Sequence, residues 1–257
     1  MQKEHKVMAK GNFITYVNLP KTYKFDLGDG FILTFPDNVN NNPLKIFVLN
    51  VDTVEEPVKE EDIINKLKGF VNWFSLYFNA PCEDIELNEI VFEDSKGKRG
   101  MSVRSLFLAG SLEIKDTDVK KFGNIIKIQE LNDSHKYCLE LFRRARLMDD
   151  LYGNFWQIYI IMLILLYDSD AGGSERGQID KELRLCSPEM QILINDFNKK
   201  EGRKSDWTIF IAIRDSFSHK STFSGEELDI DKELNENMEN FLEIARKIIL
   251  DRLGIDI

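Results

Sequence analysis

The chain has 257 residues, of which 43% are hydrophobic and 30% charged, and this composition excludes disordered, collagen-like and coiled-coil proteins. Its formal net charge of −10, with acidic residues in excess in both 1–130 and 131–257, excludes a basic domain that holds nucleic acid through overall charge. The three cysteines include no close pair, which predicts neither a disulfide framework nor a metal site. The first residues are polar, which predicts no signal peptide. We therefore expect a folded cytoplasmic protein without metal or cofactor.

Short β-prone runs separated by turns fill the first part of the chain. The residues Gly28-Asp29-Gly30 lie between the second and third runs and predict a β-hairpin connection. His5 precedes these runs in a polar terminus that we expect to be mobile. We expect a strand meander from the runs at Phe13–Val17, Thr22–Leu27, Phe31–Phe35 and Leu44–Val51.

A helix is expected from about Asp62 to Phe78, because apolar residues recur there at spacings of three and four. A Gly- and Lys-containing turn is expected near Ser95–Gly100. Further strands are expected at Ile85–Phe92, Ser102–Ala109 and Asn124–Gln129. Residues 1–130 are therefore predicted to form an α+β, strand-rich domain that senses a ligand or binds a partner.

From Asn132 onward the apolar spacing is helical throughout. The last helix is the clearest, since Gly254 follows it where a helix stop is expected. Candidate helices run over Asp133–Met148, Leu151–Tyr167, Ser174–Leu185, Pro188–Lys199, Asp206–Ser218 and Asp231–Leu253. The pattern predicts an all-α helical bundle over residues 131–257.

One segment of this bundle, Phe155–Tyr167, is apolar except for Gln157. A membrane-spanning helix needs about 20 such residues, so these thirteen are too few. We expect a fully buried central helix, or one that also faces a partner subunit, and no membrane association.

Common phosphate-loop, dinucleotide, zinc-protease and hydrolase motifs are absent from the sequence. The residues Gly172-Gly173-Ser174, followed by Glu175 and Arg176, are compatible with anion binding at a helix start. A flexible connection capped by Ser174 is the simpler interpretation, because no lysine or second glycine motif accompanies them. We assign this segment no function.

His219 has the most informative context of the three histidines, since His135 is expected on the surface of a helix's first turn. It follows a helix that apolar residues anchor, with Ser205 or Asp206 as the expected cap. Asp215 lies four residues before His219, on the same helix face, where a carboxylate can orient the imidazole. Arg214 lies about 140° around the helix from His219, so the two meet one phosphate only if the helix end bends or a second copy contributes.

The residues Arg214-Asp215-Ser216-Phe217-Ser218-His219 resemble the motif of ribonucleases in the HEPN superfamily. Those proteins carry Arg, a polar residue, three further residues and His near the end of a late helix in a short helical bundle. The resemblance covers about the last 125 residues and implies a homodimer in which two motif copies form a composite site. Ser221 stands where some HEPN toxins have a tyrosine, so the subfamily regulated through that tyrosine is not indicated.

RNA cleavage without a metal ion requires a base for the 2′-hydroxyl, an acid for the leaving oxygen and cations for the charge on phosphorus. His219 suits the acid or base role, and Asp215 suits the tuning of its tautomer. Arg214 can hold a phosphate oxygen pair in bidentate fashion. The expected products are a 2′,3′-cyclic phosphate and a 5′-hydroxyl, from an RNA such as tRNA.

A strand-rich domain ahead of a HEPN bundle is similar to the ApeA-type arrangement in bacterial anti-phage defence. That resemblance implies a defence or toxin-type system whose first domain meets an inhibitory partner or a phage-derived trigger. A different hypothesis stays open, in which the bundle only dimerises and binds a ligand or partner. Under that hypothesis Arg214 pairs with surface carboxylates and His219 caps the helix end.

Overall fold

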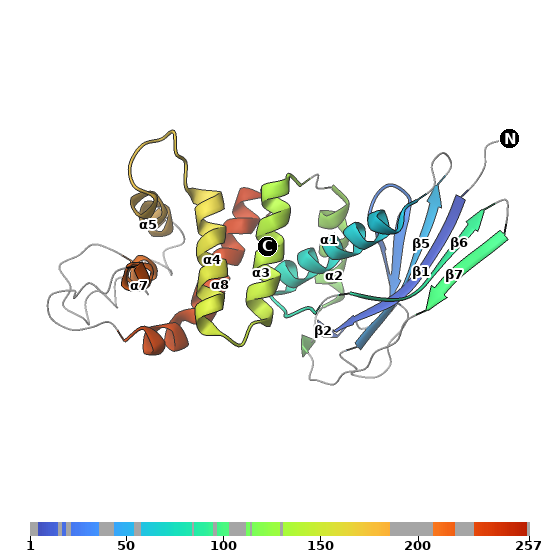
Figure 1. Cartoon of the computed structure of the whole chain (residues 1–257), viewed down its shortest axis with the longest axis horizontal. Helices are drawn as coiled ribbons and strands as arrows, with labels where there is room; N and C mark the ends of the chain where they lie inside the picture. The colour runs from blue at the N-terminus through green and yellow to red at the C-terminus, as the bar shows by residue number, and fades with distance from the viewer. Residues whose placement is uncertain are drawn as a thin grey trace. The chain divides into compact units, whose positions relative to one another are not determined.

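The computed structural model describes residues 5–14, 17–18, 22–35, 44–53, 58–83, 85–94, 97–102, 112–113, 115–128, 131–185, 208–218 and 229–255. The chain divides into two compact units, Met1–Leu139 and Glu140–Ile257 (Figure 1). The division falls within helix α3 (Asp133–Leu147). The first unit combines an antiparallel sheet with helices, and the second is helical over its described residues.

A six-stranded sheet forms the first unit, in the order β3-β4-β5-β1-β6-β7, and all neighbouring strands are antiparallel. A separate parallel pair joins β2 (Val17–Asn18) and β8 (Leu112–Glu113). The strands of the large sheet are β1 (His5–Ile14), β3 (Tyr23–Asp26), β4 (Phe31–Phe35), β5 (Leu44–Thr53), β6 (Glu86–Asp94) and β7 (Gly97–Ser102).

The predicted hairpin at Gly28-Asp29-Gly30 is confirmed and joins β3 to β4. All three residues have positive φ angles, of 78°, 53° and 79°, which glycine adopts without steric cost and aspartate tolerates. Asp26 stabilises the turn by accepting a 3.0 Å hydrogen bond from the backbone N–H of Gly28. The turn sequence was therefore a sufficient signal for this connection.

The start of the chain differs from the prediction. His5 begins β1 and pairs with Thr53, so it belongs to the sheet and not to a mobile terminus. The first part of the strand was missed because Lys6 and Lys10 flank the buried residues Val7 and Ala9, which gives this segment a low overall hydrophobicity. β1 lies between β5 and β6, so only β3-β4-β5 form the expected meander.

Two helices, α1 (Glu60–Phe78) and α2 (Asp116–Ile128), pack with the aromatic residues of the sheet. The ring of Phe122 lies 5.7 Å from those of Phe25 and Phe70 and 5.5 Å from that of Phe74, measured between centroids. Edge-to-face and tilted contacts of this kind are favourable between aromatic rings. Phe122 is fully buried at the centre of this cluster.

One local prediction in this unit is wrong, and a second is correct only in part. The strand expected at Asn124–Gln129 is helical as far as Ile128, since Val119 and Phe122 form a buried face at a spacing of three. The neighbouring Ile125 and Ile126 had favoured a strand because both are β-branched. The turn expected near Ser95–Gly100 is at the correct place in the chain but was predicted too long, because Asp94 of β6 already pairs with Gly97 of β7.

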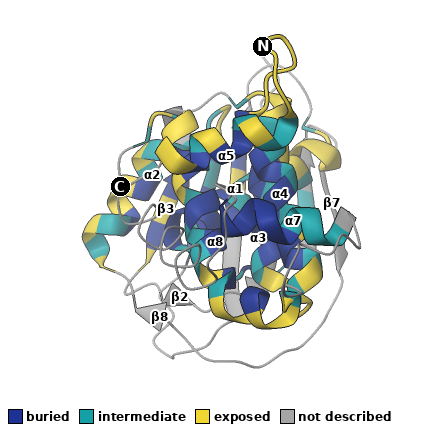
Figure 2. Cartoon of the chain, turned by 90° about the vertical axis from the view of Figure 1, so that its left-hand side faces the viewer, coloured by how far each residue is buried: buried dark blue, intermediate teal, exposed yellow. Residues whose placement is uncertain are grey.

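The helical prediction for the second half is confirmed over the residues described. The helices after α3 are α4 (Leu151–Leu166), α5 (Glu175–Leu185), α7 (Ile209–Ser218) and α8 (Ile230–Arg252). α4 packs against α5 and α8, α7 packs against α8, and Figure 2 shows the buried face of α8 in dark blue. Gly254 has a φ of 67° and ends α8 as expected. The predicted helix at Pro188–Lys199 lies outside the described residues.

Helix α4 is only partly buried, which corrects the expectation of a fully buried central helix. Ile158, Ile161 and Met162 are buried, whereas Trp156 and Tyr167 are each 37% exposed. α4 packs against α5 and α8, and at about 100° per residue Trp156 lies on the side of the helix opposite to Ile158, Ile161 and Met162. Among the described residues, none of the helices has the length and apolar character that a membrane span requires.

Candidate functional site

Helix α7 carries two of the three residues selected from the sequence. Buried Ile211 and Ile213 fix the helix in the second unit, and Arg214 and Asp215 follow them. The side chain of Arg214 is 21% exposed and that of Asp215 is 14% exposed, so both are half-buried charges that need partners. His219 lies outside the described residues, and its expected pairing with Asp215 stays a prediction.

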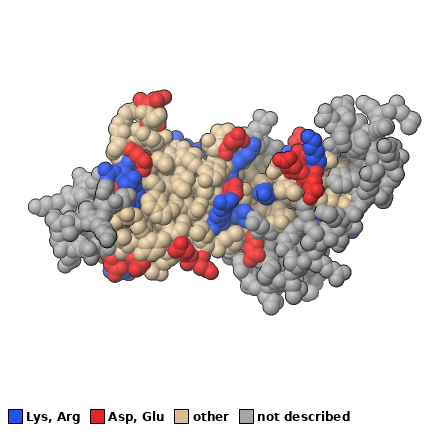
Figure 3. Space-filling view, in the orientation of Figure 1, with Lys and Arg blue, Asp and Glu red and all other residues tan. Residues whose placement is uncertain are grey.

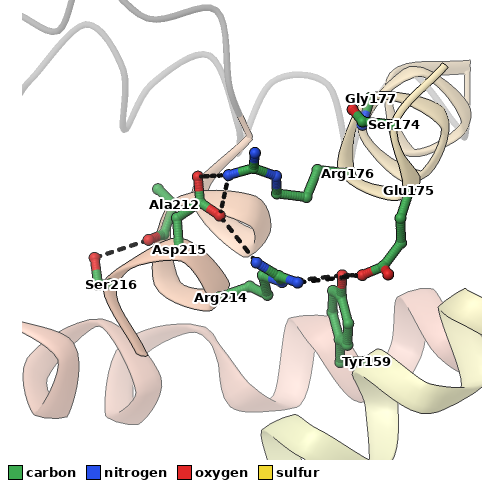
Figure 4. Close-up of polar contacts among 9 residues, drawn as sticks. All are labelled: Tyr159, Ser174, Glu175, Arg176, Gly177, Ala212, Arg214, Asp215 and Ser216. Carbon is green, nitrogen blue, oxygen red and sulfur yellow. Dashed lines mark hydrogen bonds and ion pairs between the residues drawn. The ribbon is translucent and has the colours of Figure 1, made fainter. Parts of the chain in front are cut away.

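Arg214 is held by partners from three helices (Figure 4). Its Nε donates a 3.1 Å hydrogen bond to the hydroxyl of Tyr159 in α4, and its Cζ lies 5.6 Å from the centroid of that ring. Its Nη2 lies 3.4 Å from Oε1 of Glu175 in α5. Its Nη1 lies 3.3 Å from Oδ1 of the adjacent Asp215. These contacts fix the plane of the guanidinium group against α4.

A second guanidinium shares the carboxylate of Asp215. Nη1 of Arg176 donates to both carboxylate oxygens of Asp215 at 2.7 Å, as Figure 4 shows. Arg176 comes from α5, 39 residues earlier in the chain. Asp215 therefore brings two guanidinium groups together, a role that the sequence did not indicate.

The hydroxyl of Tyr159 connects Glu175 to Arg214. It donates a hydrogen bond to Oε1 of Glu175 and accepts one from Nε of Arg214. Burial raises the pKa of Tyr159 to about 12, and the hydrogen bond to Glu175 raises it too, while Arg214 opposes both. Tyr159 is therefore a neutral donor at physiological pH.

The pKa of Arg214 responds to the same surroundings. Burial lowers it, but the hydrogen bond with Tyr159 and the charges of Glu175 and Asp215 raise it by more. The net result is a pKa above the ordinary value. Arg214 is therefore cationic at physiological pH.

A second set of bonds holds α5 against α7. Asp180 is buried, and its Oδ1 accepts a 2.7 Å hydrogen bond from the backbone N–H of Thr208, which precedes α7. Its Oδ2 accepts a 2.7 Å bond from Nε of Arg184. Asp180 lies one turn after Arg176, on the same face of α5. That face therefore fixes both the start of α7 and the carboxylate of Asp215.

The start of α5 confirms the simpler interpretation of the glycine segment. Gly172 and Gly173 have φ angles of 72° and 93°, and Oγ of Ser174 accepts a 3.2 Å hydrogen bond from the N–H of Gly177. The segment is a helix connection with a serine cap. The segment nevertheless places Glu175 beside Arg214 and Arg176 beside Asp215, and no sequence pattern had predicted these contacts.

We name Tyr159, Glu175, Arg176, Arg214 and Asp215 the Arg214 cluster. Two guanidinium groups and two carboxylates balance in charge, so an incoming anion must compete with Glu175 and Asp215. Figure 3 shows the same balance on a larger scale, with Lys and Arg atoms beside Asp and Glu atoms over the described residues of one face. Within the described ranges, no group of three or more His, Cys, Asp or Glu side chains is placed to hold a metal ion.

Two of the five members were accessible to sequence reasoning, and three were missed. Tyr159 lies inside the apolar run of α4, which had indicated only packing. Glu175 and Arg176 follow the glycine segment that we had interpreted as a helix connection without a function. The one available signal is the spacing of Arg176, Asp180 and Arg184 on a single face of α5.

Comparison with protein-family models, with curated proteins and with solved structures found no match.

Proposed function

We propose that the chain is a metal-independent endoribonuclease of the HEPN superfamily. The observation that carries the proposal is that the guanidinium groups of Arg214 and Arg176 both contact the carboxylate of Asp215. Arg214 stands five residues before His219 in the chain. Two guanidinium groups on one carboxylate are suited to a phosphate that gains charge during cleavage. The arrangement supports an Arg/His site and adds Arg176 to it.

In the proposed reaction His219 removes the proton of the 2′-hydroxyl or protonates the leaving 5′-oxygen. The 2′-oxygen attacks phosphorus and the bond to the 5′-oxygen breaks, which leaves a 2′,3′-cyclic phosphate and a 5′-hydroxyl. Arg214 and Arg176 stabilise the charge on the non-bridging oxygens, and Asp215 orients both. A homodimer supplies the base and the acid from two copies of His219, which answers the difficulty that ideal helix spacing separates Arg214 and His219 by about 140°.

Cleavage assays on purified protein test this reaction directly. Incubation with tRNA and with total RNA is expected to give 5′-hydroxyl ends, and Arg214→Ala and His219→Ala are each expected to lower the rate at least about 100-fold. Arg246→Ala is a matched control, because Arg246 is similarly buried but pairs with Glu243 of its own helix. Cleavage that survives both substitutions would exclude these residues from the mechanism.

The biological setting that we propose is bacterial anti-phage defence or a toxin-type system. The sheet-containing first unit is assigned the recognition of an inhibitory partner or a phage-derived trigger, and RNA, with tRNA as the first candidate, is the substrate. Expression of the wild-type chain in bacteria is expected to arrest growth, and His219→Ala is expected to relieve the arrest. Equal growth with both chains in the presence of phage would contradict this setting.

A second candidate is a non-catalytic protein that dimerises and binds a ligand or partner. The charge balance of the Arg214 cluster favours it, since Glu175 and Asp215 already neutralise both guanidinium groups. A dimer structure separates the two candidates. Two His219 side chains far apart and facing acidic surface would favour the binding protein, and two that face each other beside Arg214 would favour the nuclease.

A further inference from the structure

An exposed tryptophan lies beside the Arg214 cluster. Trp156 is 37% exposed, although its neighbours Phe155 and Ile158 in α4 are fully buried. Its ring packs against two other rings, with centroid distances of 5.7 Å to Tyr159 and 5.6 Å to Phe217. Phe217 in turn contacts Tyr152, also exposed, at 5.2 Å. Trp156 is thus a rigidly supported ring with part of its surface open to solvent.

Tyr159 connects this ring to the guanidinium groups. The rings of Tyr159 and Trp156 form a T-shaped pair, and Cζ of Arg214 lies 5.6 Å from the Tyr159 centroid. Phe217, the other support, lies between Arg214 and His219 in the motif itself. The exposed ring and the proposed phosphate-binding groups therefore share their supporting residues.

We propose that Trp156, with Phe217 and Tyr152 around it, is a stacking site for an unpaired RNA base next to the phosphate held at Arg214. This inference rests on the proposed ribonuclease function and specifies its substrate as single-stranded RNA. Aromatic rings beside cationic groups are how proteins hold single strands without reading their sequence, because every base has a face that can stack. A paired base has both faces covered within the duplex, so double-stranded RNA cannot occupy the site.

Position, and not exposure alone, is the reason for selecting Trp156. Tyr167, the residue that follows the last residue of α4, is equally exposed. It lies eleven residues further on, about 16 Å along the helix axis at 1.5 Å per residue, and so beyond the reach of one nucleotide held at Arg214. Tyr167→Ala is therefore the matched control for Trp156→Ala.

The experiment measures binding separately from cleavage. The probe is a fluorescein-labelled single strand of 2′-O-methyl ribonucleotides, which lacks the hydroxyl that attacks phosphorus, and its anisotropy is followed on addition of the full-length protein at low salt. Trp156→Ala is expected to weaken binding about tenfold, Trp156→Phe to keep it within about threefold, and Tyr167→Ala to leave it unchanged. The same strand in a duplex is expected to bind at least about tenfold more weakly than the single strand.

A second readout keeps the test decisive if Trp156→Ala fails to fold. Base stacking quenches tryptophan fluorescence, so the single strand is expected to quench the wild-type protein more than Trp156→Phe. Equal quenching, equal affinity of Trp156→Ala and wild type, or no binding by the wild type overturns the inference. If cleavage still depends on Arg214 and His219 in those cases, the proposed function stands without this stacking site. If stacking-dependent binding occurs without cleavage, the site stands and the nuclease proposal fails.

Discussion

The aromatic cluster around Phe122 in the first unit and the Arg214 cluster in the second both join residues distant in sequence, but they are built differently. Phe122 contacts rings that have no charge to satisfy, so its environment favours nothing beyond close packing. Arg214 contacts a hydroxyl and two carboxylates, each at a defined nitrogen. Substitution in the first cluster should therefore change stability, and substitution in the second should change activity with little change in stability.

The largest expected effect is a loss of stability in the aromatic cluster around Phe122. Phe122→Ala removes a fully buried ring and should lower the free energy of unfolding by about 3–5 kcal/mol, as measured by urea denaturation. Tyr137→Ala removes an exposed ring from the same unit and should change it by less than about 0.5 kcal/mol. Similar losses for the two variants would show that the cluster is not the core of its unit.

The next largest expected effect is a loss of activity after substitution in the Arg214 cluster. Arg176→Ala removes one of the two guanidinium groups on Asp215 and should lower the rate of RNA cleavage about 100-fold. Its free energy of unfolding should change by less than about 1 kcal/mol, because the pair is partly exposed. Arg252→Ala, which breaks another partly exposed ion pair of α5, should leave the rate unchanged. An Arg176→Ala protein that is unstable but fully active would show that Arg176 contributes to stability and not to activity.

A smaller effect of opposite sign is expected from Glu175→Gln. Glutamine keeps an acceptor for the Tyr159 hydroxyl but removes a negative charge from Nη2 of Arg214. Binding of RNA should become about 2- to 5-fold tighter at low salt, and the gain should shrink at high salt. Glu182→Gln in the same helix, whose partner is Arg252, is the control. Weaker binding by Glu175→Gln would show that Glu175 helps to build the site instead of competing with the substrate.

The smallest effect is a change in pH dependence. The pKa of Tyr159 is raised from 10.0 to about 12, chiefly by burial, so the folded state favours the protonated hydroxyl. This contribution to stability is full below pH 10 and is lost as the pH rises from 10 to 12. Tyr159→Phe should therefore lose less stability than the wild type over that interval, as urea titrations at pH 9 and pH 11 would show, with Tyr167→Phe as the control. Parallel losses in all three proteins would contradict the assignment.

The sequence predicted the elements whose side-chain spacing is regular. Helices α1, α3, α4, α5 and α8 and strands β3 to β6 lie within a few residues of their expected positions. The errors occur where local preference and tertiary packing disagree. Ile125 and Ile126 favour a strand locally, but they belong to the helix that packs Phe122 into the aromatic cluster.

The candidate site was predictable only in part, for a related reason. Arg214 and Asp215 were recognisable because they belong to one short motif. Arg176 and Tyr159 join them through a tertiary arrangement, from 39 and 55 residues away, and no spacing rule covers such distances. The role of Asp215 as a bridge between two arginines follows from that arrangement and not from its distance to His219.

The bond between Asp180 and the backbone N–H of Thr208 makes that amide a reporter of the α5–α7 contact. Its hydrogen is held by a side chain of another helix, so it exchanges with solvent only when the two helices separate. Exchange of this single proton therefore measures how often α5 leaves α7, and with it how often Arg176 leaves Asp215. A ligand that changes that rate without touching Arg214 would act on the site through the position of one helix.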